Sequence, residues 1–220
     1  MTRHRYSEAE RSAVYRVIRE RRDMRHFRPD PIDGAVLARL LDAAHAGPSV
    51  GYMQPWRFIR ISDRSLRHAI HRLVAREQDT TAEACGPRAE QVRRLKLEGI
   101  LECGEVLVAA LAEGRERYVL GRRTQPDMDL CSLACAIQNL WLAARAEGLG
   151  LGWVSLFDPP ELAVLLKLPA GSRPVAILCL GHVEEFYPEP LLETAGWDSR
   201  RPLQQVLFEN AWDRPLEGSD

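Results

Sequence analysis

Hydrophobic residues at helical spacing predict two helices in the first fifty residues. Ser7 and Glu10 are spaced as a capping box, and the apolar residues after them predict a helix that runs to about Arg22. Asp33 is placed to cap a second helix, whose apolar stripe ends at Ala44. Prolines separate the two helices and a Gly-Pro pair follows the second, so both helices have defined ends.

Short hydrophobic runs, bounded by turn residues, predict four strands further along the chain. These runs span residues 56–61, 106–111, 150–157 and 175–181. Helical spacing predicts further helices over residues 63–76, 88–100, 128–147 and 159–166. Residues 77–88 have little periodicity and contain a Gly-Pro pair, so we interpret them as a loop or mobile segment. The pattern indicates a mixed fold with more helix than strand.

The helix predicted over residues 128–147 is the most hydrophobic long segment of the chain. Its residues are apolar nearly all round, which is typical of a helix at the centre of a fold or in a subunit interface. No internal repeat, low-complexity linker or break in composition divides the sequence. We therefore expect one domain over residues 1–220, with an aromatic, proline-containing C-terminal extension over about residues 182–220.

Composition narrows the class of protein. The 220 residues carry 30 Lys and Arg against 31 Asp and Glu, a net charge of -1, and 45% of them are hydrophobic. These values are typical of a globular domain and argue against a generally basic nucleic-acid binder. The N-terminal segment is charged throughout and lacks the apolar core of a secretory signal. The longest apolar run, residues 106–112, is too short to span a bilayer. We expect a cytoplasmic protein that binds neither nucleic acid nor membrane.

The cysteines and histidines form no recognisable metal site. Five cysteines are scattered along the chain, and no spacing matches a zinc site. Cys131 and Cys135 lie one helical turn apart and are a possible ligand pair, but we favour their being small, buried, reduced residues. His68 and His71 share a charged helix face without a completing carboxylate pattern. We expect no bound metal.

Three arginines gather at the end of the first predicted helix. Arg21, Arg22 and Arg25 lie within five residues, with Asp23 among them. Guanidinium groups match phosphate oxygens bidentately, so the group is a candidate phosphate clamp. The alternative is that these cations only complement the helix dipole and remain solvated. Spacing alone does not separate the two interpretations.

Two further segments combine glycine with polar and aromatic residues. Residues 48–56 carry a glycine, a hydroxyl, an amide and aromatic rings, a set suited to line a flat heterocycle. They are equally suited to a rigid connection whose Trp56 fills the core. Gly148, Gly150 and Gly152 superficially suggest a dinucleotide fingerprint, but they follow a helix and precede a strand. That order is the reverse of a phosphate-binding strand-turn-helix, which excludes a Rossmann site.

Taken together, the three segments resemble the FMN-dependent nitroreductase-like family. The order is Arg-Arg-x-x-Arg, then Pro-Ser-x-x-x-x-Gln-Pro-Trp, then Gly-Leu-Gly after a long apolar helix. Longer motifs resemble one branch of that family, the 5,6-dimethylbenzimidazole synthases, over nearly the whole chain. These motifs lie at residues 21–25, 48–56, 95–100, 138–148 and 152–155.

The resemblance implies a fold, an assembly and a reaction. The fold is α+β, with a mainly antiparallel central sheet flanked by helices, in a homodimer with FMN sites at the subunit interface. The reaction fragments reduced FMN with dioxygen to 5,6-dimethylbenzimidazole, the lower ligand of cobalamin, and erythrose 4-phosphate. A separate flavin reductase would supply the reduced FMN.

The resemblance also implies roles for individual residues. Asp23 and Ser155 match the two polar residues that the family places beside the flavin ring and implicates in turnover. The residues matched to FMN binding are Arg21, Arg22, Asp23, Met24, Arg25, Ser49, Gly51, Arg88, Leu97 and Ser155. The segment over residues 77–88 diverges from the family pattern and lacks a methionine expected there.

Two other functions share the candidate phosphate clamp. One is an ordinary nitroreductase or flavin reductase, in which FMN stays bound and NAD(P)H delivers hydride. The other is a flavin-binding protein without turnover. Asp23 together with Ser155 favours the flavin-fragmenting reaction over an ordinary nitroreductase or flavin reductase.

Overall fold

The computed structural model describes residues 4–216, which fall into two compact units. The first unit is Met1–Phe186 and the second is Tyr187–Asp220. The boundary lies a few residues after the expected start of the C-terminal extension. The last four residues of that extension, and the first three of the chain, lie outside the described residues.

The first unit is built on a four-stranded sheet in the order β1-β2-β4-β3. Its strands are β1 (Trp56–Arg60), β2 (Glu105–Leu111), β3 (Gly150–Val154) and β4 (Arg173–Gly181). All three neighbouring pairs are antiparallel, and the β2–β4 pairing shifts register between Ala109 and Ala110. The expected antiparallel sheet is confirmed. β3 is an edge strand of this sheet, and the candidate clamp lies beside it.

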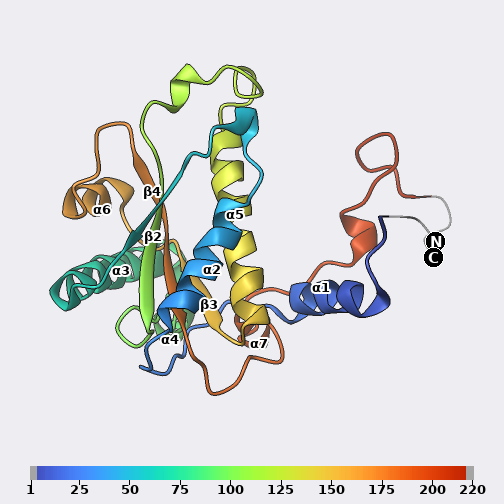
Figure 1. The fold of residues 1–220 in the computed structure, drawn as a ribbon. Coiled ribbons are helices and arrows are strands. Elements are labelled where there is room, and N and C mark those ends of the chain that lie inside the picture. The colour runs from blue at the N-terminus through green and yellow to red at the C-terminus, as the bar shows by residue number, and fades with distance from the viewer. Residues whose placement is uncertain (1–3, 217–220) are drawn as a thin grey trace. The chain divides into compact units, whose positions relative to one another are not determined.

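Helices cover both faces of the sheet. α2 (Gly34–His45) and α5 (Met128–Ala146) pack on one face, and α3 (Arg64–Ala84) and α6 (Pro159–Leu165) lie on the other (Figure 1). Every residue of β2 is buried, because its alternate side chains enter different hydrophobic clusters. The structure is thus the α+β arrangement that the sequence predicts.

Local signals set the starts of several helices. The Ser7–Glu10 capping box forms in full at α1 (Glu8–Glu20), with both reciprocal hydrogen bonds present. Asp33 caps α2 and Asp63 caps α3, each by accepting two main-chain N–H bonds. The ends of these helices are confirmed to within a few residues, except that of α3.

Residues 77–88 are not a loop, which corrects the sequence interpretation. α3 continues to Ala84, and only residues 86–88 form a separate 3-10 turn. Ala82 is fully buried, and the Gln78 amide donates to the carbonyls of Val92 and Leu95. These tertiary contacts stabilise a stretch whose own sequence has little amphipathic period.

The helix predicted over residues 88–100 is much shorter than expected. α4 spans only Ala89–Arg94. Gly99 then packs so closely on Phe27 that an added Cβ would lie 2.5 Å from that ring. The chain after α4 is therefore an irregular segment that packs against Phe27, just after the three clustered arginines.

The second unit contains little regular structure. It holds the four-residue helix α7 (Leu191–Thr194), a 3-10 turn at Leu203–Gln205 and a bridge between Phe208 and Pro215. The rings of Phe208 and Trp212 lie 5.4 Å apart, centroid to centroid. No helix of the described residues is long and apolar enough to cross a membrane.

Candidate functional site

The segment that carries the three arginines runs along the edge strand β3. The Met24 N–H donates to the Leu151 carbonyl at 3.0 Å, and Asp23 forms a parallel bridge with the same residue. Gly152 makes this approach possible, because a Cβ there would lie 2.2 Å from the Met24 carbonyl oxygen. Met24 itself is buried and anchors the segment. The glycine-rich stretch therefore serves close backbone packing.

Asp23 and Arg25 form a hydrogen-bonded pair on the main chain of Trp153. The Trp153 N–H donates to Asp23 Oδ1 at 2.8 Å, and Arg25 Nη2 donates to Asp23 Oδ2 at 2.6 Å. The same Arg25 nitrogen donates to the Trp153 carbonyl at 2.9 Å. Burial raises the pKa of the Asp23 carboxyl above its ordinary value, although Arg25, the Trp153 N–H and Arg21 favour the charged form. A carboxyl of this kind is suited to exchange a proton at a site.

Arg21 and Arg22 are held by contacts with α5. The Arg21 guanidinium lies over the Trp141 ring, with Cζ 4.5 Å from the ring centroid. The Trp141 indole N–H donates to the Arg22 carbonyl at 3.1 Å. Arg22 Nη1 donates to the carbonyls of Arg19 and Arg21, at 2.7 and 2.9 Å. Arg22 thus complements a carbonyl at the end of α1, as the alternative interpretation has it, whereas Arg21 and Arg25 are held by contacts with Trp141 and Trp153.

Ser155 lies close to this group along the chain. It follows the last residue of β3, is exposed, and stands two residues after Trp153. The Trp153 main chain holds Asp23, so Ser155 is two residues along the chain from the Asp23 contact.

The loop over residues 48–55 has a strained and well-anchored backbone. Gly51, Tyr52 and Gln54 all adopt the left-handed conformation, with φ of 53°, 53° and 49°. The Val50 N–H donates to Ser132 Oγ on α5, and the Gln54 N–H donates to Ser49 Oγ, both at 3.0 Å. Tyr52 is 84% exposed. The loop presents an aromatic side chain and main-chain groups to the outside.

The clamp and this loop lie toward different ends of α5. Trp141 contacts the clamp and Ser132 contacts the loop, and the two are nine residues apart on one straight helix. At the rise of an α-helix this is about 14 Å along the axis. One chain therefore does not bring Ser49 and Gly51 together with Arg21, Arg22 and Arg25.

The remaining candidate residues lie in the segment around α4. Leu97 precedes Gly99, and an added Cβ on Gly99 would lie 3.0 Å from the Arg25 carbonyl oxygen. The segment that contains Leu97 thus passes close to Arg25 at Gly99. Arg88 lies in the 3-10 turn before α4, where its Nε donates to the Gln91 side chain at 3.1 Å.

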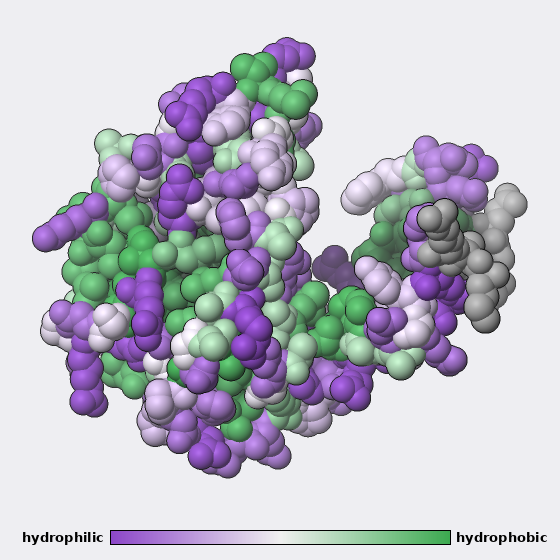
Figure 2. Space-filling model, viewed as in Figure 1, coloured by the Kyte–Doolittle hydropathy of each residue, from purple (hydrophilic) through white to green (hydrophobic). Residues whose placement is uncertain are grey.

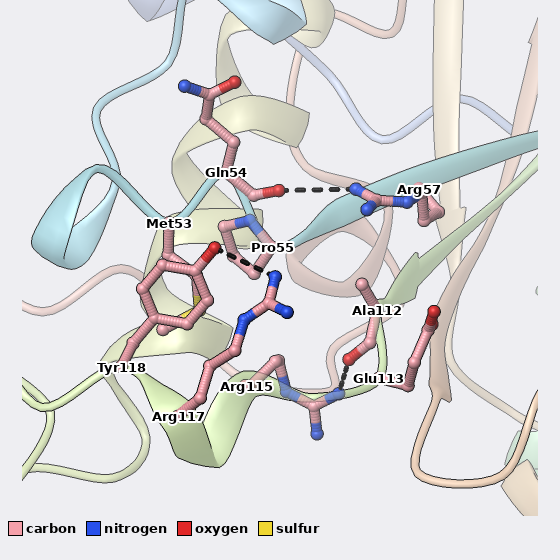
Figure 3. A pocket seen from close by; sticks show the side chains of 9 residues that line it. All are labelled: Met53, Gln54, Pro55, Arg57, Ala112, Glu113, Arg115, Arg117 and Tyr118. Carbon is pink, nitrogen blue, oxygen red and sulfur yellow. Dashed lines mark hydrogen bonds between the residues drawn. The ribbon is translucent and has the colours of Figure 1, made fainter.

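A hollow beside the loop contains three arginines that the sequence analysis did not single out. It is lined by Met53, Gln54, Pro55, Arg57, Ala112, Glu113, Arg115, Arg117 and Tyr118 (Figure 3). Arg57 donates to the Gln54 and Trp56 carbonyls, and Arg117 lies over the Tyr118 ring. Arg115 is paired at 2.8 Å with the buried carboxylate of Asp129. These arginines are scattered in sequence, so no motif indicated them.

The cysteines are free, and their burial only partly follows the expectation. Cys103 and Cys179 are buried, but Cys131 and Cys135 are exposed on α5. The interpretation of those two as buried residues is therefore wrong. The apolar neighbours of α5 cover its other faces, which leaves this stripe uncovered within one chain. Among residues 4–216, no group of three His, Cys, Asp or Glu side chains is placed to hold a metal ion.

Most of the first unit matches one protein family. The family model described as "Nitroreductase family" matches residues 18–182, about three quarters of the chain. The chain belongs to the nitroreductase family. The matched region begins within α1 and ends just after β4, so it contains all ten of the candidate site residues.

Within the nitroreductase family, this chain is similar to several named proteins. It is 46% identical to the 5,6-dimethylbenzimidazole synthase of Rhodospirillum rubrum, over 83% of this chain and 87% of that protein. It is 40% identical to the protein of the same name from Rhodobacter capsulatus, over 90% and 97% of the two chains. The crystal structure of a BluB-like flavoprotein from Clostridium difficile 630 has the same fold, with a TM-score of 0.70, 19% identity, and coverage of 89% and 98%.

Proposed function

We propose that this chain is a 5,6-dimethylbenzimidazole synthase, an oxidoreductase that uses dioxygen to fragment reduced FMN. The products are 5,6-dimethylbenzimidazole and erythrose 4-phosphate. The observation that carries the proposal is the Asp23–Arg25 pair, held on the Trp153 main chain within a cluster of three arginines. The extensive identity to two synthases supports the same conclusion.

The residues present fit FMN. A phosphate dianion is recognised by guanidinium groups, and three of them are fixed along five residues by main-chain and aromatic contacts. The lack of a Cβ at Gly152 lets this segment lie directly on the edge strand. We assign the phosphate and ribityl side of FMN to Arg21, Arg22 and Arg25, with Met24 as their anchor.

Asp23 and Ser155 are then the polar groups on the ring side of the clamp. Reduced FMN, when bound, supplies the electrons that dioxygen accepts. Asp23 is suited to take up or release a proton at Oδ1 or Oδ2, because burial has raised its pKa and Arg25 keeps it oriented. The Ser155 hydroxyl is suited to donate a hydrogen bond to a ring atom, since it is exposed at the end of β3.

The site requires a second copy of the chain. Ser49 and Gly51 lie toward the other end of α5 from the clamp, so a two-fold partner that packs antiparallel along α5 would bring its own loop to the clamp.

Exposed hydrophobic residues on the surface support this assembly. α1 buries none of its residues although Val14, Tyr15 and Ile18 are large and apolar. Hydrophobic residues also lie exposed at the tip of the β2–α5 segment, where Val119 and Leu120 are 64% and 78% exposed (Figure 2).

The remaining parts of the proposal concern supply and location. A separate flavin reductase would deliver reduced FMN, because the proposed reaction consumes FMN and needs a new molecule for each turnover. The substrates are then reduced FMN and dioxygen, with no nucleic acid or membrane partner. We infer a cytoplasmic protein.

The test compares three reactions of the purified chain. Chemically reduced FMN is mixed with the protein in air, and products are identified by chromatography and mass spectrometry. Parallel samples receive FMN with NADPH, or FMN with NADPH and a nitroaromatic compound. If the protein is a synthase, 5,6-dimethylbenzimidazole forms in the first sample. Rapid NADPH oxidation with FMN recovered intact would instead identify an ordinary nitroreductase, and no reaction in any sample would leave a flavin-binding protein.

A further inference from the structure

Trp141 lies at the centre of the contacts that hold the arginine cluster. It lies in the C-terminal half of α5 and is 8% exposed. Its ring lies beneath the Arg21 guanidinium, at 4.5 Å from Cζ to the centroid. Its ring also lies near the Trp153 ring, with centroids 6.4 Å apart and planes tilted by 35°. Trp141 thus contacts both Arg21 and the strand residue whose main chain holds Asp23 and Arg25.

The polar edge of Trp141 contacts the same segment. Its indole N–H donates to the Arg22 carbonyl at 3.1 Å. Trp141 packs near the Trp153 side chain. The main chain of Trp153 donates a hydrogen bond to Asp23 and accepts one from Arg25. Trp141 therefore contacts Arg21 and Arg22 directly and reaches Asp23 and Arg25 through a single residue.

We propose that Trp141 is a positioning residue that sets the arginine cluster for phosphate and so makes the site selective for a phosphorylated flavin. The inference rests on the proposed function, because it assigns the FMN phosphate to these arginines. The Arg21 guanidinium lies over the Trp141 ring, and this contact restricts its orientation. Holding Arg21 in one orientation before binding also reduces the entropy that phosphate binding must overcome.

A purely structural role for Trp141 predicts a different result. If the indole only fills the core, its loss destabilises the fold and weakens the binding of every flavin to the same extent. If the indole positions the arginines, its loss weakens the binding of FMN, which has the phosphate. The binding of riboflavin, which lacks the phosphate, then stays nearly unchanged. The ratio of the two dissociation constants therefore separates the two roles.

The experiment measures that ratio by flavin fluorescence for four forms of the full chain. They are the wild type, Trp141→Leu, Trp141→Phe and Leu140→Ala. Phe keeps a ring beneath Arg21 but removes the N–H to the Arg22 carbonyl. Leu140 is fully buried on the same helix, so Leu140→Ala is a matched loss of core packing. Urea unfolding of each form confirms that it is folded and orders the forms by stability.

The expected result is a fall of at least about tenfold in the preference for FMN in Trp141→Leu, a smaller fall in Trp141→Phe, and no change in Leu140→Ala. In product formation, Trp141→Leu should raise KM for reduced FMN while kcat stays within about twofold. Three results would overturn the inference. They are an unchanged ratio of the two dissociation constants in Trp141→Leu, an equal fall in the FMN preference of Leu140→Ala, and a loss in Trp141→Leu that is confined to kcat. If the wild type forms no product, the proposed function fails, and the flavin ratio still tests Trp141.

Discussion

At the scale of single residues, the sequence identified the charged groups but not what holds them. The arginines and Asp23 stand out because they are adjacent, and their pairing through Arg25 is a short-range contact. Trp141 and Trp153 lie within motifs of the family resemblance, but the sequence did not indicate their contacts with the clamp, since a tryptophan in an apolar helix or strand is typical of a core residue. Their contacts with residues 21–25 span more than a hundred positions and depend on the folded sheet.

Asp23→Asn should abolish product formation without abolishing FMN binding. The amide keeps the shape and an acceptor for the Trp153 N–H, but it does not exchange a proton, so the rate should fall by about 100-fold or more. Product analysis and flavin titration measure the two effects separately. Normal turnover in this variant would show that Asp23 has been wrongly assigned.

The raised pKa of Asp23 also gives a signed pH dependence. A carboxyl whose pKa is higher in the folded than in the unfolded protein contributes stability at pH values below its ordinary pKa, and that contribution is lost as pH rises through the raised value. We propose that Asp23 acts as a base, so product formation should instead rise with pH through the same range, because only the carboxylate accepts a proton. Comparing urea midpoints of wild type and Asp23→Asn across this range checks the first expectation.

Gly152→Ala should disturb the clamp through its backbone. The new Cβ would lie 2.2 Å from the Met24 carbonyl oxygen and 2.8 Å from Arg25 Nη1, so the segment must move away from β3. We expect a loss of about 1–3 kcal/mol in the free energy of unfolding, together with weaker FMN binding. Gly34→Ala is the control, because nothing lies within 4 Å of a Cβ there. Equal behaviour of the two variants would contradict the close approach.

At the scale of elements, prediction succeeded where the signal is local. The caps at Ser7 and Asp33 and the hydrophobic runs of the strands specify their elements from adjacent residues. It failed at the C-terminal half of α3, because Gln78 and Ala82 gain their stability from residues more than ten positions away. It also failed after α4, which ends at Arg94 although a helix to residue 100 was expected.

The segment between β2 and α5 depends on one buried carboxylate. Asp129, whose side chain is 7% exposed, pairs with Arg115 at 2.8 Å and with Arg122 at 3.4 Å. The segment in turn supports the loop, since a Cβ on Gly51 would lie 2.9 Å from the Leu120 carbonyl oxygen. This carboxylate therefore links α5 to both the hollow and the loop.

Asp129→Ala should cost about 3 kcal/mol in the free energy of unfolding, because it leaves two partly buried guanidinium groups without their carboxylate. Glu90→Ala breaks the exposed Arg94–Glu90 pair, whose side chains are 78% and 65% exposed, and should change stability by less than about 0.5 kcal/mol. Urea unfolding measures both. Similar small losses would mean that Asp129 does not anchor the segment.

At the scale of the whole molecule, the decisive property is that the candidate residues form two groups. Sequence order alone did not show this, because residues 21–25 and 48–56 are close along the chain. In the fold they lie toward different ends of α5. The family resemblance implied an interfacial site, and the separation within one chain is its physical counterpart.

Mixing two inactive variants tests the shared site. Arg22→Ala removes a clamp guanidinium, and Gly51→Val places a β-branched side chain at φ 53° against the Leu120 carbonyl. In a mixed dimer one site combines the intact clamp of one chain with the intact loop of the other. Random reassortment should therefore restore about a quarter of wild-type activity. No recovery, with mixed dimers verified by mass spectrometry, would show that each chain holds a complete site.

The central claim is that the protein consumes the flavin it binds. In the most direct measurement, excess protein is loaded with chemically reduced FMN without oxygen, mixed once with aerated buffer, and analysed by quantitative chromatography and mass spectrometry. We predict that 5,6-dimethylbenzimidazole forms in about equal molar amount to the FMN that disappears. Full recovery of intact FMN, with no benzimidazole, would contradict the account.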